Sequence, residues 1–202
     1  MGNSTSELSQ TVVSIATTPL CQLAVKYGTD KRLYHTYTPY YYELLKDHKV
    51  ELMLEIGVGT PNAMVTSDGS VYQTGASLRM WRDFFPKAQV IGVDNDPVGM
   101  ITDDRISTIL CDQHNIGELW NRIPRTMTFD LIVDDGSHLP DDQVVTATVL
   151  WPLLRLGGIY IIEDVAYPWI REILQPYSAM TVEFEKDLPT KDNRLVVMRK
   201  WR

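Results

Sequence analysis

The sequence predicts a single α/β domain in which a mostly parallel sheet is covered by helices on both faces. The first observation behind this prediction is that short apolar runs alternate with helix-like stretches from residue 51 onward, as they do in parallel sheets. The second is a change of rhythm at residue 179, after which two strand-like runs follow each other without a helix. The 202 residues, 44% of them hydrophobic, suit one domain with one substantial core.

The first fifty residues are expected to form a helical cover, and residues 51–202 a Rossmann-like core. Thr18–Pro19 and Thr38–Pro39 each join a residue that caps helices to one that favours the first helical turn. These pairs predict helix starts at about residues 19 and 39.

Five buried strands are predicted in the core, each a short apolar run that ends in glycine or acid: 51–57, 88–94, 105–110, 128–135 and 157–164. Helices are predicted between them at 77–85, 115–123 and 140–156. Gly157–Gly158 is expected to stop the last helix, whose predicted apolar surface consists of Val144, Val145, Thr148, Leu150 and Trp151. The runs 179–185 and 194–200 complete a seven-stranded sheet as an antiparallel pair.

Composition excludes several classes of partner. The formal net charge is −7 and the basic residues do not cluster, so we expect no nucleic acid. No apolar run approaches the roughly 20 residues that span a bilayer, and no signal peptide or disulfide framework is indicated, so we expect a cytoplasmic protein with no membrane partner. The start matches the N-myristoylation pattern through Gly2 and Ser6, and the alternative is an unstructured terminus.

The ends of the predicted strands carry most of the functional signal, because ligands of parallel α/β sheets bind at the carboxyl ends of the strands. The residues found there are Glu55, Gly57 and Gly59 at the end of the first strand, Asp94 at the end of the second, Asp112 at the end of the third, Asp134 and Asp135 at the end of the fourth, and Glu163 and Asp164 at the end of the fifth. Each residue alone is also consistent with a tight turn or a helix cap.

Taken together, these strand ends favour a nucleoside ligand. Gly57 and Gly59 allow close approach to the first turn, and Asp94 can accept both hydroxyls of a ribose. A dinucleotide such as NAD is disfavoured, because the third glycine of its fingerprint is absent and Asp94 lies farther along than the roughly 20 residues typical of that motif. An acidic rim suits a cationic nucleoside such as S-adenosylmethionine better than a pyrophosphate.

The stretch IVDDGSHLPDD, residues 132–142, concentrates carboxylates at the tip of the fourth strand. Neighbouring strands lie about 4.8 Å apart, so Asp135, Glu163 and Asp164 are expected to converge. Such a group strongly raises one carboxyl pKa, and a hard divalent cation with oxygen ligands removes that strain. The alternative is that these acids cap the turns that follow them, as we expect of Asp141 and Asp142 at a solvated helix start.

His138 lies three residues beyond Asp135 and is therefore expected beside this cation site. A neutral imidazole there could take the proton of a hydroxyl during group transfer, and the alternative is a structural role. The remaining histidines, His35, His48 and His114, are interpreted as structural, and Trp81, Trp151 and Tyr160 as core residues.

The chain resembles the metal-dependent sugar O-methyltransferases of macrolide biosynthesis, the mycinamicin 2''-O-methyltransferase family, over roughly residues 26–166. The resemblance rests on KYGTDK, HTYTPYYYELL, EIGVGT, TGASLRMWRDFFPKAQVIGVDND, CDQ, FDLIVDDGSH and GGIYIIEDV, with DDGSH followed by IED the most specific signature. It implies a class I methyltransferase fold, S-adenosylmethionine as methyl donor, and Mg²⁺, or alternatively Mn²⁺, at the acceptor hydroxyl.

The resemblance also implies a role for each matching residue of this sequence. The implied donor site consists of Glu55, Gly57 and Gly59 in the turn 55–61, Ser77, Asp94 at the ribose, Asp112 and Gln113 at the adenine, Asp134, and Thr29 closing over the donor. The implied metal ligands are Asp135, Glu163 and Asp164, and the implied general base is His138.

The predicted function is therefore metal-dependent methylation of a hydroxyl on a sugar or other small natural product. A non-catalytic protein that binds the adenosyl ligand, or an interaction module, is the main alternative. A hydroxylase is a weaker one, because iron centres usually need two histidines. The short segment after the fifth strand departs from the family and puts a glycosylated acceptor in doubt. The polar loop 60–76 could act as a lid, and a homo-oligomer is possible.

Overall fold

The computed structural model describes residues 17–61, 64, 71–184 and 193–201. The myristoylation pattern at Gly2 and Ser6 therefore lies outside the described residues, as does much of the loop 60–76. Along the part of the chain that is described, no helix combines the length and the apolar character needed to cross a membrane.

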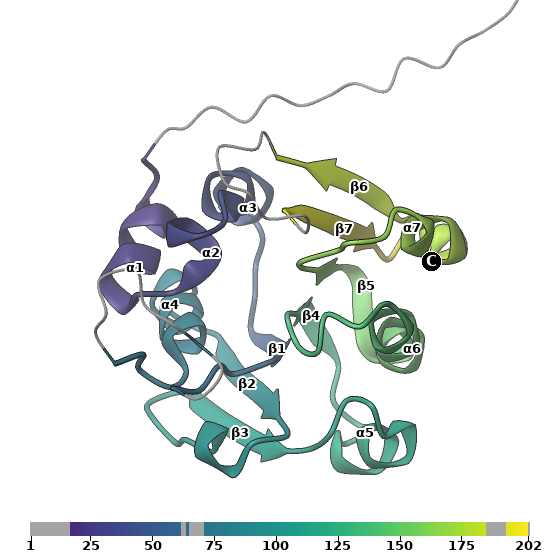
Figure 1. The fold of residues 1–202 in the computed structure, drawn as a ribbon, viewed down its shortest axis with the longest axis horizontal. Coiled ribbons are helices and arrows are strands. Elements are labelled where there is room, and N and C mark those ends of the chain that lie inside the picture. Colours follow the sequence, from purple (N-terminus) through teal and green to yellow (C-terminus); the bar gives the residue numbers. More distant parts are fainter. Residues whose placement is uncertain (1–16, 62–63, 65–70, 185–192, 202) are drawn as a thin grey trace, which may run out of the picture.

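The sheet has seven strands in the order β3-β2-β1-β4-β5-β7-β6 (Figure 1). Five of them pair in parallel, whereas β7 runs antiparallel to both β5 and β6. The predicted seven-stranded sheet with an antiparallel C-terminal pair is therefore confirmed. The strands are β1 (Leu52–Ile56), β2 (Gln89–Asp94), β3 (Ile106–Leu110), β4 (Phe129–Asp134), β5 (Leu154–Ile162), β6 (Met180–Glu183) and β7 (Arg194–Arg199).

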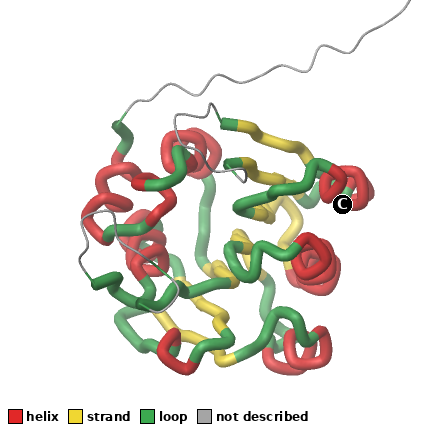
Figure 2. The backbone as a smooth tube through the Cα atoms, viewed as in Figure 1, coloured by secondary structure: helices red, strands yellow, loops and turns green. Residues whose placement is uncertain are grey.

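Helices cover both faces of the sheet, which confirms the predicted layers (Figures 1 and 2). One face packs against α1 (Pro19–Tyr27), α3 (Tyr37–Leu45) and α4 (Ala76–Phe84), with the short α2 (Asp30–Leu33) between α1 and α3. The opposite face packs against α5 (Ile116–Arg122), α6 (Pro140–Leu150) and α7 (Trp169–Ile173). Two apolar clusters result, one on each side of the sheet, as expected for strands that are buried on both faces.

The described part of the cover, residues 17–50, contains three helices, although the sequence predicts two starts. The start at Pro19 is confirmed, with the Thr18 side chain accepting a hydrogen bond from the backbone N–H of Cys21. The start predicted at Pro39 is wrong by two residues, because α3 begins at Tyr37 and the Thr38 hydroxyl bonds to the Cys21 sulfur instead of capping a helix. The helix α2 was not predicted.

The boundary between α6 and β5 also differs from the prediction. The α-helix ends at Leu150 and gives way to a 3-10 turn, Trp151–Leu153, in which Pro152 has no N–H to continue the helical hydrogen bonds. The strand then starts at Leu154, and Gly157 lies inside it, donating its N–H to the Lys200 carbonyl. The glycines therefore do not stop the helix.

The apolar surface predicted for α6 is only partly correct: Leu150 is buried, and Val144 and Trp151 pack against the same apolar cluster. Val144 and Val145 are only half-buried and Thr148 is exposed. The buried face is largely polar because its side chains bond to the strand ends: Gln143 donates to the Glu163 carbonyl at 2.9 Å. The buried residues of this helix are Asp142, Gln143, Thr146, Ala147 and Leu150, so Asp142 is not solvated as expected. Of the predicted core aromatics, Trp81 and Tyr160 are fully buried and Trp151 is half-buried.

Candidate functional site

The register of the sheet brings the predicted acids to one edge. Ile56 pairs with Asp134, and Asp134 pairs with Ile162, so the residues that follow β1, β4 and β5 lie side by side. Backbone hydrogen bonds of 2.9 Å from Asp135 N–H to the Ile56 carbonyl and from Glu163 N–H to the Asp134 carbonyl fix the same alignment. The sequence argument that the strand ends share one rim is thus correct.

A buried lysine sits at the centre of this rim. Lys31 has no exposed surface, and its Nζ lies 2.6 Å from Asp135 Oδ2, 2.8 Å from Glu163 Oε1 and 3.2 Å from Glu55 Oε1. It is the only buried lysine or arginine in the described ranges. Its ammonium supplies part of the positive charge that the sequence argument assigns to a metal alone. Sequence reasoning missed it.

A second group of contacts surrounds Asp164. The Tyr37 hydroxyl donates to Asp164 Oδ1 at 2.6 Å, and His35, stacked on Tyr37, brings its Nε2 to 3.5 Å from the same oxygen. On the other side, His138 Nε2 lies 3.6 Å from Asp164 Oδ2 and 3.2 Å from Asp135 Oδ1. His35, interpreted from the sequence as structural, therefore lies next to the rim and contacts one of its acids.

Among the residues that the structure describes, two sets of side chains could hold a cation. Ligand atoms of Asp135, His138 and Asp164 all lie within 4.8 Å of one another, and so do those of Glu55, Asp135 and Glu163. Asp135 belongs to both sets. The second set surrounds the Lys31 ammonium, whereas the first does not.

Burial and charge act against each other on these carboxyl groups. Burial works to raise the pKa of Asp135, but the adjacent Lys31 and His138 outweigh it and hold that pKa below its usual range. Burial and the charge of Asp135 raise the pKa of Asp164 to about 6, and burial raises that of Glu163 well above its usual value. The single ammonium of Lys31 cannot neutralise all of these carboxylates, so the rim retains a net negative charge that favours a bound cation.

The His138 side chain is 42% exposed, and its acidic neighbours favour the protonated form of its imidazole. Burial works to lower its pKa, but the hydrogen bond to Asp135 and the charge of Asp164 raise it to about 9. A protonated imidazole cannot act as a base, so a basic role requires that the charge of the two carboxylates first be neutralised.

Both His138 and Asp164 have left-handed backbone conformations, with φ of 57° and 53°. Such conformations cost about 1–3 kcal/mol in residues other than glycine and cluster at functional sites, where the surrounding structure enforces them. The turns after β4 and β5 are therefore built to aim these two side chains at one point.

The glycine turn after β1 packs directly against the acidic rim. Gly57 has φ 88°, and a Cβ built on it would lie 2.0 Å from the Asp135 carbonyl oxygen. The glycine is thus required both for its conformation and for the close approach of β1 to the turn after β4.

Gly57→Ala is expected to destabilise the fold and displace Asp135. Gly28→Ala is the matched control, because Gly28 also has positive φ, 74°, but open space where a Cβ would be. We expect the strain of positive φ, about 1 kcal/mol, in both variants, and at least about 2 kcal/mol more in Gly57→Ala from the clash. Urea denaturation of both variants measures the difference, and equal loss of stability in the two would contradict the close contact.

The predicted donor residues surround this turn. Glu55 is fully buried and accepts hydrogen bonds from the Ser77 hydroxyl at 2.9 Å and from the Trp81 indole at 3.2 Å. The Asp94 carboxylate accepts the N–H of Val58 at 2.8 Å, so it already orients the glycine turn. Thr29 is fully buried and caps α2, the helix that carries Lys31.

The predicted adenine residues lie on the other side of the turn after β4. Gln113 is buried, donates to Asp134 Oδ1 at 2.9 Å and accepts the N–H of Ser137 at 2.8 Å, so its amide supports the turn that holds Asp135. Burial raises the pKa of Asp134 to about 7. Asp112 accepts the N–H of His114.

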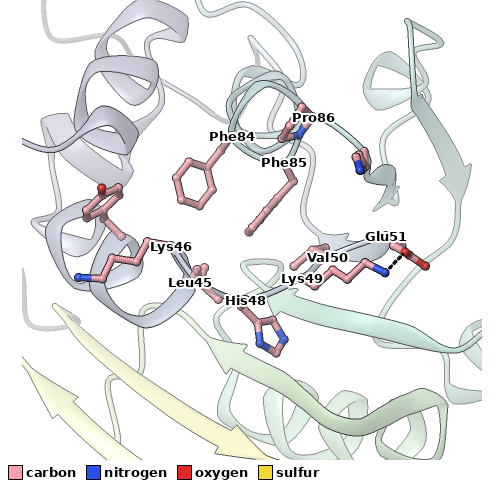
Figure 3. Close-up of a pocket in the computed structure, with 11 residues that line it drawn as sticks. Leu45, Lys46, His48, Lys49, Val50, Glu51, Phe84, Phe85 and Pro86 are labelled. Carbon is pink, nitrogen blue, oxygen red and sulfur yellow. Dashed lines mark ion pairs between the residues drawn. The ribbon is translucent and has the colours of Figure 1, made fainter.

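A pocket of about 290 Å³ lies elsewhere, at the amino ends of β1 and β2 (Figure 3). Its lining includes Leu45, His48, Phe84 and Phe85, and Lys49 pairs there with Glu51. None of the predicted site residues lines it, so this pocket is separate from the rim.

Solved structures that are similar to this chain share its architecture. The MycE methyltransferase from the mycinamycin biosynthetic pathway, in complex with Mg and SAH, matches with a TM-score of 0.70 and 26% identity over 94% of this chain and 56% of that chain. The O-methyltransferase TomG from Streptomyces achromogenes matches with a TM-score of 0.55 over 89% of this chain and 90% of that chain, and its 14% identity shows the fold alone. The sheet order and these likenesses define a class I methyltransferase fold.

Comparison with sequences of named enzymes shows which members of this class the chain is similar to. The chain is 36% identical over 149 residues to the 8-demethyl-8-(2-methoxy-alpha-L-rhamnosyl)-tetracenomycin-C 3'-O-methyltransferase of Streptomyces olivaceus, and 37% identical over 149 residues to the mycinamicin VI 2''-O-methyltransferase of Micromonospora griseorubida. The chain is thus related to the macrolide and sugar O-methyltransferases, which confirms the resemblance. Each match covers 72% of this chain, but only 36% and 35% of the two relatives, so the chain spans little more than a third of their length. No family model matches the chain.

Proposed function

We propose that this protein transfers the methyl group of S-adenosylmethionine to a hydroxyl of a sugar carried by a natural product, and that a divalent cation assists the transfer. The observation that carries the proposal is the convergence of Asp135, His138 and Asp164, whose ligand atoms lie within 4.8 Å of one another beside the glycine turn. The relatives support it, because their names describe sugar O-methyltransferases and MycE has been solved with Mg, SAH and mycinamycin VI.

On the donor side, the glycine turn would admit the donor closely and Asp94 would accept its ribose hydroxyls. Glu55, Ser77, Asp112 and Gln113 would complete this half of the site, together with Gly59, Asp134 and Thr29. The acidic character of the rim suits the positive sulfonium of S-adenosylmethionine.

On the acceptor side, the donor set fits a divalent cation, because Mg²⁺ and Mn²⁺ prefer oxygen ligands and the rim stays acidic after Lys31 is counted. We propose Asp135, Glu163 and Asp164 as the ligands. When bound there, the cation would orient the acceptor hydroxyl and lower its pKa.

His138 is proposed as the general base. In the ion-free protein Asp135 and Asp164 hold a proton on its imidazole, as the pKa of about 9 indicates. Once the charge of these carboxylates is neutralised, the imidazole becomes able to take the hydroxyl proton as the methyl group moves.

The direct test is to incubate the purified protein with S-adenosylmethionine, Mg²⁺ and a panel of glycosylated natural products with free sugar hydroxyls. The expected result is one methylated sugar per S-adenosylhomocysteine formed, detected by mass spectrometry. Tight binding of the donor without methylation of any acceptor in the panel would favour the non-catalytic alternative instead. A homo-oligomer stays a prediction, as does the division into a cover and a core.

Asp94→Ala is expected to weaken binding of S-adenosylhomocysteine by about tenfold to a hundredfold, because charged hydrogen bonds of this kind contribute about 1.5–3 kcal/mol. Calorimetry on the folded variant measures the loss. Asp96→Ala is the control: Asp96 also accepts backbone and hydroxyl hydrogen bonds in the same turn, from Val98 and Thr60, but is not assigned to the ribose. Wild-type affinity in Asp94→Ala would remove Asp94 from the site.

A further inference from the structure

We propose that Lys31 is a positioning residue whose ammonium permanently fills a second cation site, so that the wild-type protein binds one divalent cation where its carboxylates could bind two. The inference rests on the proposed function for the first cation only. Its own basis is the pair of overlapping ligand sets that share Asp135.

The two oxygens of the shared carboxylate, that of Asp135, face different partners. Asp135 Oδ2 accepts a hydrogen bond from Lys31 at 2.6 Å, whereas Oδ1 faces His138 at 3.2 Å. Glu163 likewise offers Oε1 to Lys31 at 2.8 Å. One oxygen of each acid is thereby taken by the lysine, and the other oxygen of Asp135 lies in the ligand set with His138 and Asp164.

The ammonium has the surroundings of a bound cation. It lies against three carboxylates at the ends of three different strands, β1, β4 and β5, and its side chain is completely buried. A buried charge is costly unless it is paired, so neither the ammonium nor the three carboxylates would be stable here without the other.

The local backbone conformation places Lys31 at this position. It belongs to the four-residue helix α2, which the buried Thr29 caps, and Gly28 ends the preceding helix with the left-handed φ of 74°. The sharp turn between α1 and α2 points the lysine into the sheet edge. Its hydrogen-bond partners Asp135 and Glu163 lie 104 and 132 residues away in sequence.

Removing the ammonium should expose a site of three carboxylate oxygens. Such oxygens bind hard divalent cations, and carboxylates commonly bridge two metal ions about 3.5–4 Å apart. We therefore expect Lys31→Met, which keeps the length of the side chain but not its charge, to gain a second metal ion. Lys31→Arg should restore the wild-type stoichiometry because it restores the positive charge.

The test is a Mn²⁺ titration of the full chain, with free Mn²⁺ counted by electron paramagnetic resonance. The expected result is one Mn²⁺ per chain for the wild type and for Lys31→Arg, and two for Lys31→Met, with the signal of a spin-coupled pair. Lys26→Met is the control, since Lys26 is a surface lysine paired with Asp83 and should keep a stoichiometry of one. Lys31→Gln serves as a second neutral variant if Lys31→Met does not fold.

Each outcome bears on a different claim. Equal stoichiometry in the wild type and in the neutral folded variants would overturn the role of Lys31, and so would two ions in the wild type. No ion in the wild type but one in Lys31→Met would support the role of Lys31 and contradict the cation assigned under the proposed function. The two proposals can therefore fail separately.

Discussion

Removal of divalent cations with EDTA is expected to lower methyl transfer by about 10³-fold or more, because a bound cation supplies several kcal/mol of stabilisation to the developing charge. Binding of S-adenosylhomocysteine should stay within about twofold of its original affinity, since the donor residues Gly57 and Asp94 belong to the β1 and β2 side of the sheet. Excess Mg²⁺ or Mn²⁺ should restore activity.

The same effect should appear when a single ligand is altered. Asp164→Asn keeps the shape of the side chain and its contact with Tyr37 but removes the negative charge, so it should raise the Mg²⁺ concentration needed for activity. Asp141→Asn is the control, because Asp141 is an exposed acid at the start of α6. If protein that has been freed of divalent cations with EDTA kept full activity, the metal assignment would be refuted.

His138→Ala is expected to lower the rate constant of methyl transfer by about 10²- to 10⁴-fold, the usual contribution of a general base, while donor affinity stays unchanged. Residual activity should rise with pH, because the acceptor hydroxyl then ionises without help. Single-turnover kinetics across a range of pH measure both effects.

His114→Ala is the matched control for this experiment. His114 is also paired with a carboxylate, that of Asp142 at 2.8 Å, and its pKa is also raised by that hydrogen bond, but its side chain is 75% exposed and Asp142 is not one of the proposed metal ligands. It should retain wild-type turnover. A His138→Ala variant with wild-type turnover would return His138 to a structural role.

The sheet and its acidic rim could be predicted from the sequence because both depend on local patterns. Apolar runs that end in acid identify parallel strands, and the parallel register then forces residues such as Asp135 and Glu163 together without further information. The glycine at position 57 is recognisable for the same reason, since the turn directly follows the first strand.

The partners of these acids could not be predicted in this way. Lys31 and Tyr37 lie in the stretches KYGTDK and HTYTPYYYELL, but the residues they contact are more than a hundred positions away, and the local sequence does not show which acids these are. A lysine in a short polar segment is normally solvated, so the burial of Lys31 could be found only from the tertiary structure. The polar buried face of α6 escaped prediction for a similar reason, because Gln143 and Thr146 are buried by their hydrogen bonds rather than by hydrophobicity.

The contacts of residues 29–37 also limit where this domain can be joined to parts of its relatives in a chimera. Lys31, His35 and Tyr37 come from before the first strand, yet each contacts an acid that follows a strand. A crossover placed between the helices and the sheet would separate the acids of this chain from the side chains that pair with them, and a chimera would inherit acids without these partners. Exchange of acceptor specificity between relatives is therefore best made outside this segment, with residues 29–37 and the strand ends taken from the same parent.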